Sequence, residues 1–221
     1  CFNPNSGTLE FWVRPNWNQD LNANYVIWGA GVDGMGWTGV QYYEIRVNGN
    51  DINFILPWNG SSLPIATIYS SGLTAGTWYH IVAVWSRWTI DGTNYAKIYL
   101  NETSTGVTTN QHNPGGGWST PSVFTVGHRY KPYEAVHEAY FNGVIAGRIL
   151  NRPLTSAEVT TNYASGAGHT DTFIVTPDTV WLGAYSDSDD DAVFQHRGQS
   201  VSAITNGATE SALTLGEAVG N

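Results

Sequence analysis

The chain has 221 residues, of which 41% are hydrophobic and 12% charged, and its formal net charge is −9. Nine Lys and Arg residues are too few for the basic face of a nucleic-acid-binding protein, and the apolar content argues against intrinsic disorder. No run of about 18 apolar residues is present, so we expect no membrane span. The 25 Gly, 10 Trp and 12 Tyr residues are typical of many short strands joined by turns.

The first quarter of the chain predicts antiparallel strands. Residues 8–14 alternate apolar and polar side chains, which indicates a strand that is buried on one face only. Residues 42–47 and 51–56 flank Asn48-Gly49, and Asn-Gly between two alternating segments is the strongest short signal for a β-hairpin.

The middle of the chain contains the most apolar predicted strand. Residues 78–85 form a long apolar run, which predicts a central strand covered on both faces. The strand tryptophans Trp28, Trp78 and Trp85 are expected in the core. Residues 101–120 are polar and rich in Gly, and we interpret them as a loop. Further strands are predicted at residues 25–28, 96–100, 122–126 and 143–150.

One short helix is expected after Pro153. Thr155 and Glu158 form a capping box, in which the Thr155 hydroxyl accepts from the Glu158 N–H and the Glu158 carboxylate bonds back. Val159 and Tyr163 are four residues apart and should face the core together. Tertiary packing must hold a helix this short.

The character of the sequence changes after Gly168. The residues that follow are smaller and more polar, and they include the only charge run of the chain. Short strands are predicted there at residues 173–175, 179–182, 201–204 and 212–215. We therefore expect a main domain over residues 1–168 and a β-rich C-terminal extension over residues 169–221.

Four segments resemble the motifs of one known family. They are Gly7–Pro15, the Trp-x-His strand Gly76–Ala83, Lys97–Asn101 and Phe141–Glu158. Their order resembles that in laminin-G-like domains of the concanavalin-A-like lectin/glucanase superfamily. The resemblance implies an all-β fold, a two-sheet antiparallel jelly-roll sandwich with one short helix. This superfamily includes lectins, adhesion modules, enzymes and structural proteins, so the fold alone does not imply a function.

The sequence departs from the family pattern at two places. Ala146 and Gly147 stand where the family often has an acidic pair. Only six residues precede the opening strand, where family members usually have another strand, and a sandwich without it would expose an unpaired edge. Strand addition by the C-terminal extension, from the same chain or from a neighbour, is one way to fill that edge.

Residues of the kinds used by glycosidases and lyases are present but poorly arranged. Glu134 and Glu138 are the nearest match to a catalytic carboxylate pair, but Val136 replaces the middle acid, and their Cα atoms would lie about 13 Å apart on a strand. The neighbours at 128–130 supply His, Arg and Tyr, but three consecutive strand residues cannot face one groove. His80 matches a family core position and is interpreted as a satisfied buried histidine. We therefore expect no enzymatic activity.

Two groups of side chains are candidates for binding. The first group consists of loop aromatics that would stack on sugar rings or fill a protein interface: Trp37, Tyr42, Trp58, Trp118, Tyr130 and Tyr133. The second group consists of clustered carboxylates, which suit Ca²⁺ although a solvated acidic turn explains them more simply: Asp187, Asp189, Asp190 and Asp191. The sequence indicates no other cofactor.

These observations favour a non-catalytic recognition module that acts outside the cell, at a cell surface or on a virion. Its expected partner is a carbohydrate or a surface glycoconjugate, in a carbohydrate-binding or adhesion role. The first alternative is a structural subunit of a virion or an extracellular filament that self-assembles through its C-terminal tail. The second alternative is a glycoside hydrolase or a polysaccharide lyase.

Overall fold

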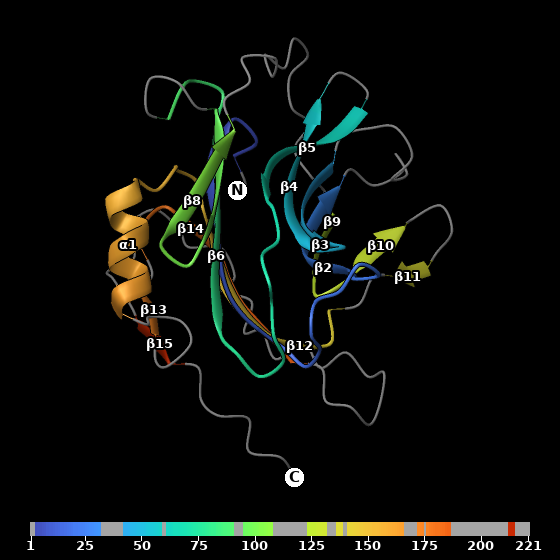
Figure 1. Ribbon diagram of the computed structural model, residues 1–221. Coiled ribbons are helices and arrows are strands. Elements are labelled where there is room, and N and C mark those ends of the chain that lie inside the picture. Colours follow the sequence, from blue (N-terminus) through green and yellow to red (C-terminus); the bar gives the residue numbers. More distant parts are fainter. Residues whose placement is uncertain are drawn as a thin grey trace.

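The computed structural model describes residues 3–31, 42–58, 61–90, 95–107, 123–131, 136–138, 141–165, 172–174, 176–186 and 212–214. Within these ranges the strands form two large antiparallel sheets that face each other, so the predicted jelly-roll sandwich is confirmed (Figure 1). Sheet A has the order β14-β12-β1-β6-β7-β8, and sheet B has the order β5-β4-β3-β2-β9.

The strands of sheet A are β14 (Thr179–Ser186), β12 (Gly143–Leu150), β1 (Ser6–Pro15), β6 (Tyr79–Ser86), β7 (Ala96–Leu100) and β8 (Thr103–Val107). Those of sheet B are β5 (Ser61–Ile68), β4 (Asp51–Trp58), β3 (Tyr42–Asn48), β2 (Asn24–Gly31) and β9 (Val123–Val126). Two small ladders join β10 (Arg129–Lys131) to β11 (Val136–Glu138), and β13 (Thr172–Ile174) to β15 (Ala212–Thr214). The helix is α1 (Ser156–Ser165).

The hydrophobic core lies between the two sheets, where alternate strand residues point inward. Trp28 and Trp85 are fully buried there, as the sequence predicts, and the Trp85 indole N–H donates to the Pro4 carbonyl at 3.1 Å. The prediction for Trp78 is wrong: it is half-buried, and its ring lies 5.4 Å from the Arg14 guanidinium. Trp78 precedes β6, so it lies outside the layer that the two sheets enclose.

Strand β1 is buried on both faces, so the prediction of a half-buried strand is wrong. Its outward residues Glu10 and Trp12 are 0% and 3% exposed. The reason is helix α1, which lies across the outer face of sheet A (Figure 1). A second apolar cluster packs there: Val82, Val84, Tyr99, Leu150, Leu154 and Val159.

The helix begins as the sequence predicts. The Glu158 N–H donates to the Thr155 hydroxyl at 3.2 Å, and the Thr155 N–H donates to the Glu158 carboxylate at 2.8 Å, so the capping box is confirmed. Val159 is buried and the Tyr163 ring stacks on the Trp12 ring at 5.9 Å. Both helix residues therefore face the outer side of sheet A and not the space between the sheets.

Strand β8 was not apparent from the sequence. Part of the predicted loop 101–120 forms β8, which pairs with β7 in sheet A, so the loop prediction is wrong for residues 103–107. Its sequence is small and polar, because an edge strand is held mainly by backbone hydrogen bonds. The predicted strand at 212–215 forms β15 over residues 212–214, whereas the one at 201–204 lies outside the described residues.

Both departures from the family pattern have structural explanations. A Cβ atom on Gly147 would collide with the Phe11 ring and lie 2.7 Å from the Glu10 carbonyl, so this position has no room for an acidic side chain. The C-terminal segment β14 pairs with β12 from Val144↔Ser186 to Leu150↔Thr179 and so lies beside it within the same chain. The domain boundary at residue 168 stays a prediction. Within the described ranges, no helix combines the length and apolar character needed to cross a membrane.

Candidate functional site

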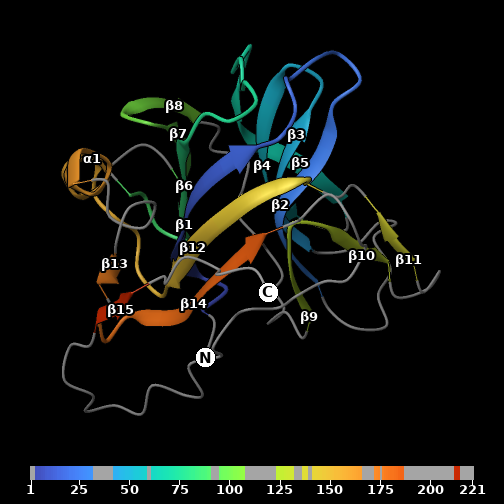
Figure 2. The ribbon, with the colours of Figure 1, turned by 90° about the horizontal axis from the view of Figure 1, so that it is seen from below.

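Sheet B contains the candidate functional site. Helix α1 lies on the sheet A side of the sandwich, whereas the β10–β11 hairpin lies on the sheet B side (Figures 1 and 2). The register of sheet B places four outward residues in one row across the strands: Val26, Arg46, Asn53 and Thr67. The next row contains Thr125, Gly29, Glu44 and Ile55. This outer face therefore combines charged, amide and hydroxyl groups.

Most polar groups of these rows are buried and bonded. The Thr67 hydroxyl donates to the Asn53 side-chain carbonyl at 2.9 Å, and the Thr125 hydroxyl donates to the Gly29 carbonyl at 3.4 Å. Glu44 is 0% exposed. All residues of the two rows except Arg46 are therefore buried, and the printed bonds of their polar groups are to neighbouring strands.

Arg46 is the exception among the residues of these two rows. Its Nη1 lies 3.7 Å from the nearest Glu44 oxygen, which is too long for a hydrogen bond. Its Nε is buried without a hydrogen-bond partner, and its side chain is 22% exposed. Buried N–H groups without partners are rare and costly in folded proteins. Within the described residues, Arg46 is therefore held by a long ion pair with Glu44 and by no hydrogen bond.

One end of sheet B gathers several predicted binding residues. The antiparallel register brings the strand ends Gly31, Tyr42, Trp58, Ser61 and Val123 to this end, which we call the loop end. Gly31 pairs with Tyr42 and with Val123, and Trp58 pairs with Ser61. The chain leaves and re-enters the sheet at these points, so the segments that carry Trp37 and Trp118 attach to the loop end.

The structure places only part of the predicted binding set. Tyr42 begins β3, Trp58 ends β4 and Tyr130 is the central residue of β10. The other three aromatics, Trp37, Trp118 and Tyr133, lie outside the described residues. Their role in binding stays a prediction.

The predicted calcium ligands also lie outside the described residues: Asp187, Asp189, Asp190 and Asp191. Among the residues that the structure does describe, no group of three His, Cys, Asp or Glu side chains is arranged to hold a metal ion. A calcium site in the acidic run stays a prediction.

The residues considered for catalysis meet in the β10–β11 hairpin. Tyr130 pairs with His137, and Arg129 pairs with Glu138. Glu134 lies outside the described residues, so the carboxylate pair that hydrolysis would need is not placed. His128 is buried, with its Nδ1 3.1 Å from the Val126 carbonyl. This contact lies between the end of β9 and the start of β10, and it gives His128 a structural role.

A different polar network lies on the outer face of sheet A. The Glu10 carboxylate accepts from His80 Nε2 at 2.9 Å, from Arg148 Nε at 2.7 Å and from Asn162 Nδ2 at 2.9 Å. The His80 ring stacks on the Trp12 ring at 4.7 Å and on the Tyr163 ring at 6.0 Å, and it is 0% exposed, although its Nδ1 has no hydrogen-bond partner among the described residues. The predicted burial of His80 is confirmed, and its hydrogen bond to Glu10 is made by Nε2.

Electrostatics explain how a fully buried carboxylate stays charged. Burial alone would raise the pKa of Glu10, but the His80 hydrogen bond and the Arg148 charge outweigh it and hold the pKa below its usual value. A buried carboxylate so compensated acts as a structural anchor, because it joins β1, β6, β12 and α1.

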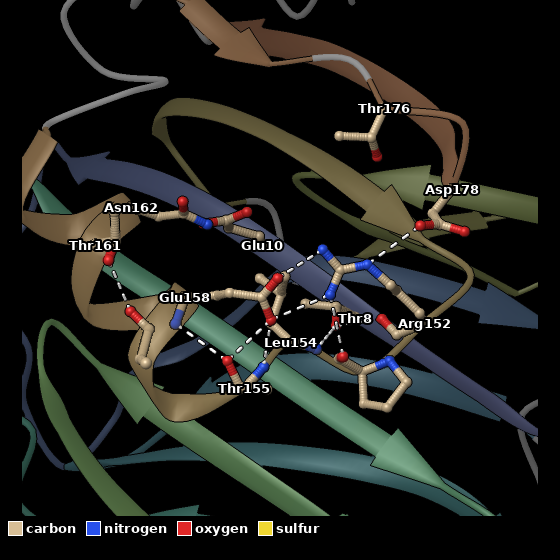
Figure 3. A network of polar contacts seen from close by, with 12 residues as sticks. Thr8, Glu10, Arg152, Leu154, Thr155, Glu158, Thr161, Asn162, Thr176 and Asp178 are labelled. Atoms are coloured by element: carbon tan, nitrogen blue, oxygen red, sulfur yellow. Dashed lines mark hydrogen bonds and ion pairs between the residues drawn. The ribbon is translucent and has the colours of Figure 1, made fainter.

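A second set of contacts joins helix α1 to the turn that precedes strand β14 (Figure 3). Arg152 donates to both Glu158 oxygens at 3.1 and 2.7 Å and to Asp178 at 3.2 Å. The Thr8 hydroxyl donates to the Arg152 carbonyl at 2.7 Å and accepts from the Leu154 N–H at 2.9 Å. The outer face of sheet A is thus closed by internal bonds between β1, β6, β12 and helix α1.

A family model described as the concanavalin A-like lectin/glucanases superfamily matches residues 1–160 of this chain. The chain belongs to this superfamily. The order of strands and the helix after β12 are therefore those of a concanavalin A-like sandwich. No significant match to a curated protein was found.

Solved structures share this concanavalin A-like fold at low sequence identity. The CBM40 domain of Ruminococcus gnavus IT-sialidase, bound to α2,6-sialyllactose, has a TM-score of 0.54 and 9% identity, covering 71% of this chain and 82% of that one. The binding domain of botulinum neurotoxin DC, in complex with rat synaptotagmin II, has a TM-score of 0.53 and 14% identity. This match covers 80% of the present chain and 40% of the toxin chain. A leech intramolecular trans-sialidase, complexed with 2,7-anhydro-Neu5Ac, has a TM-score of 0.53 and 11% identity. The match covers 71% of this chain and 23% of that chain. These likenesses establish the fold alone.

The position of Arg46 on the outward face of β3 could have been predicted from the sequence, but the sequence analysis concentrated on aromatic residues. Glu44 and Arg46 interrupt an otherwise apolar β3 at alternate positions, and period-2 alternation places both on the outward face. Their register with Asn53 and Gly29 depends on strand pairing, which local sequence does not give.

Proposed function

We propose that this chain is a non-catalytic carbohydrate-binding module, which binds its ligand at the loop end of sheet B. The observation that carries the proposal is topological. One end of one sheet collects Tyr42, Trp58 and the attachment points of the segments that hold Trp37 and Trp118. Aromatic rings beside polar groups on a rigid sheet are the usual surface for sugar recognition.

Fold neighbours support the same function. CBM40 structures are bound to α2,6- and α2,3-sialyllactose, and they align over 71% of this chain. Their identity to this chain is 9%, so they support the use of this fold for sugar binding and do not locate the ligand here. The proposed location is an extracellular or cell-surface one, where such glycans occur.

The charges of the described sheet B support a binding role over hydrolysis. Hydrolysis of a glycosidic bond normally requires two carboxyl groups within about 5–10 Å of each other. In the described rows Glu44 is the central carboxylate, and Asp51 lies about 13 Å farther along the ladder, at the turn. The Asp51 carboxylate also accepts from the Ser70 N–H at 3.1 Å. This spacing does not suit a catalytic pair.

A glycan array with matched tryptophan variants tests the proposal. We expect Trp58→Ala and Trp118→Ala to lower glycan binding by about fivefold or more, because each stacking ring contributes about 1 kcal/mol or more. Trp88→Ala is the matched control, since Trp88 is 68% exposed and lies beyond the end of β6 in sheet A. Equal binding by all four proteins, with unchanged thermal midpoints, would refute the proposed site.

Self-assembly through the C-terminal tail is the alternative function. Its test is sedimentation velocity of the full chain over a range of concentrations. A regular assembly that dissociates when residues 187–221 are removed would favour the structural role. A monomer at every concentration would leave carbohydrate binding as the function, and it would agree with the pairing of β14 to β12 within one chain.

A further inference from the structure

Four side chains form the last row of the outer face of sheet B, at the end opposite the loop end. Asn24 pairs with Asn48, and Asn48 pairs with Asp51. Tyr69 follows directly after β5, whose last residue pairs with the neighbour of Asp51. Partners in register share one face of a sheet, so these four residues form a line of about 14 Å across four strands, which we call the end row.

The end row is open to solvent. Val47 and Ile52 belong to the adjacent row and point into the core, so period-2 alternation turns the end row outward. Tyr69 is 73% exposed, and Asn24 and Asn48 are exposed as well. In the two rows farther along this face, by contrast, nearly all residues are buried.

Hydrogen bonds fix the segments that carry the end row. The Ser70 N–H donates to the Asp51 carboxylate at 3.1 Å, which holds the backbone next to Tyr69 against β4. The Gly49 N–H donates to the Ala23 carbonyl at 2.7 Å, which holds the hairpin turn against the start of β2. A surface that is fixed before binding loses little conformational entropy when a ligand binds.

The composition of the end row fits one class of ligand. The Tyr69 ring offers a flat apolar face, the amides of Asn24 and Asn48 both donate and accept, and the Asp51 carboxylate accepts. Neither amide makes a hydrogen bond to a described residue. Sugars match this combination, because they have an apolar ring face edged with hydroxyl groups. The one charge of the row is negative, so it repels an anionic sugar. We propose that the end row is a second binding site of this chain, specific for neutral sugars.

The end row is separate from the loop end. Trp58 lies seven positions after Asp51 in β4, about 23 Å along an extended strand. A disaccharide bound at one of these places does not reach the other. The inference therefore goes beyond the proposed function, since the end row binds a sugar whether or not the loop end does. With both sites occupied, the chain would join two glycans at opposite ends of one sheet.

Heteronuclear NMR titration of the isotope-labelled chain tests this site, because the side-chain amide signals of Asn24 and Asn48 report on it directly. The probes are the neutral disaccharides lactose, N-acetyllactosamine, cellobiose, maltose, mannobiose and xylobiose. We expect both amide signals and the Ser70 N–H signal to shift saturably with at least one probe. Shifts confined to the loop end, or no shift with any probe, would overturn the second site.

Variants of the aromatic residue give the second measurement. Tyr69→Ala should weaken binding at the end row about fivefold or more, because it removes the stacking face. Tyr69→Phe keeps the ring and should bind within about twofold of the wild-type chain. Trp88→Ala is the matched control, since Trp88 is 68% exposed but lies beyond the end of β6 in sheet A. Equal affinities for Tyr69→Ala and the wild-type chain would count against the proposal.

The charge of Asp51 is tested by comparing each probe that binds with its uronic-acid form. The neutral sugar should bind about fivefold more tightly at low salt. Asp51→Asn should remove this difference, because it loses the charge and keeps an acceptor for the Ser70 N–H. Equal or tighter binding of the acidic form by the wild-type chain would disprove the neutral specificity. End-row shifts that persist while Trp58→Ala leaves glycan-array binding unchanged would refute the loop end and support the end row.

Discussion

On the outer face of sheet A, Glu10 accepts hydrogen bonds from His80, Arg148 and Asn162 at 2.7–2.9 Å; on the outer face of sheet B, Glu44 and Arg46 lie 3.7 Å apart. The first set of charges lies beneath helix α1. The second lies on the sheet that this helix does not cover (Figure 2). The two outer faces therefore differ in how completely their charged groups are hydrogen-bonded within the described residues.

The difference follows from the cost of burying charge. A carboxylate placed under a helix must find its partners within the protein, because water does not reach it. Glu10 finds three, from β6, β12 and α1. The Arg46 guanidinium is partly exposed, but its Nε is buried and has no hydrogen-bond partner among the described residues. The two outer faces thus differ in the number of hydrogen bonds that compensate their buried charged groups.

The largest expected effect comes from breaking the network of sheet A. Arg148→Met removes one donor from Glu10 and leaves a buried carboxylate with less compensation. We expect the free energy of unfolding to fall by about 3–5 kcal/mol. Urea denaturation at pH 7 measures this change. A loss below about 1 kcal/mol would show that the network does not anchor sheet A.

A smaller loss is expected where β12 approaches β1. In Gly147→Ala the new methyl group would collide with the Phe11 ring and press on the Glu10 carbonyl. Overpacking of this kind costs about 1–3 kcal/mol. The unfolding midpoint should fall accordingly, and an unchanged midpoint would show that the two strands separate without penalty.

The helix cap should make an acid-sensitive contribution. Hydrogen bonds from Arg152 lower the pKa of Glu158 to about 2, from an ordinary value of 4.5. Because the folded pKa is depressed, the stabilisation is fully present above the unfolded pKa and is lost as the pH falls toward 2. Glu158→Gln should therefore cost about 1 kcal/mol at pH 7 and almost nothing near pH 2, a modest value because Glu158 is partly exposed.

Denaturation series at pH 7, 4 and 2.5 compare the wild-type chain with Glu158→Gln. Glu102→Gln is the matched control, since Glu102 is an exposed residue of the turn between β7 and β8. A cost of Glu158→Gln that stays constant with pH would contradict the assigned ion pair.

The smallest effect on stability is expected at Arg46. Arg46→Met should lower the free energy of unfolding by about 1 kcal/mol or less, because its ion pair with Glu44 is long and it makes no hydrogen bond to a described residue. Urea denaturation beside Arg148→Met checks the contrast. Equal losses for the two variants would remove the distinction between the two faces.

Local patterns allowed much of the fold to be predicted. Alternation located β1, β3 and β4, Asn48-Gly49 located the hairpin turn, and Thr155 with Glu158 located the start of α1. The candidate site was predicted less well. The aromatic residues Tyr42 and Trp58 were predicted as binding residues, and they lie at the loop end. Arg46 was not predicted, because an unbonded Nε depends on which side chains surround it in the folded sheet.

By itself the sequence determined where strands, turn and helix form, since each depends on residues within a few positions of one another. Tertiary structure alone decided that α1 covers Glu10, that β14 lies beside β12, and that Gly31, Tyr42 and Val123 meet at one end of sheet B. These outcomes depend on pairing between distant segments. Period-2 alternation gives each strand a buried face but does not name its neighbour or the element that covers its other face.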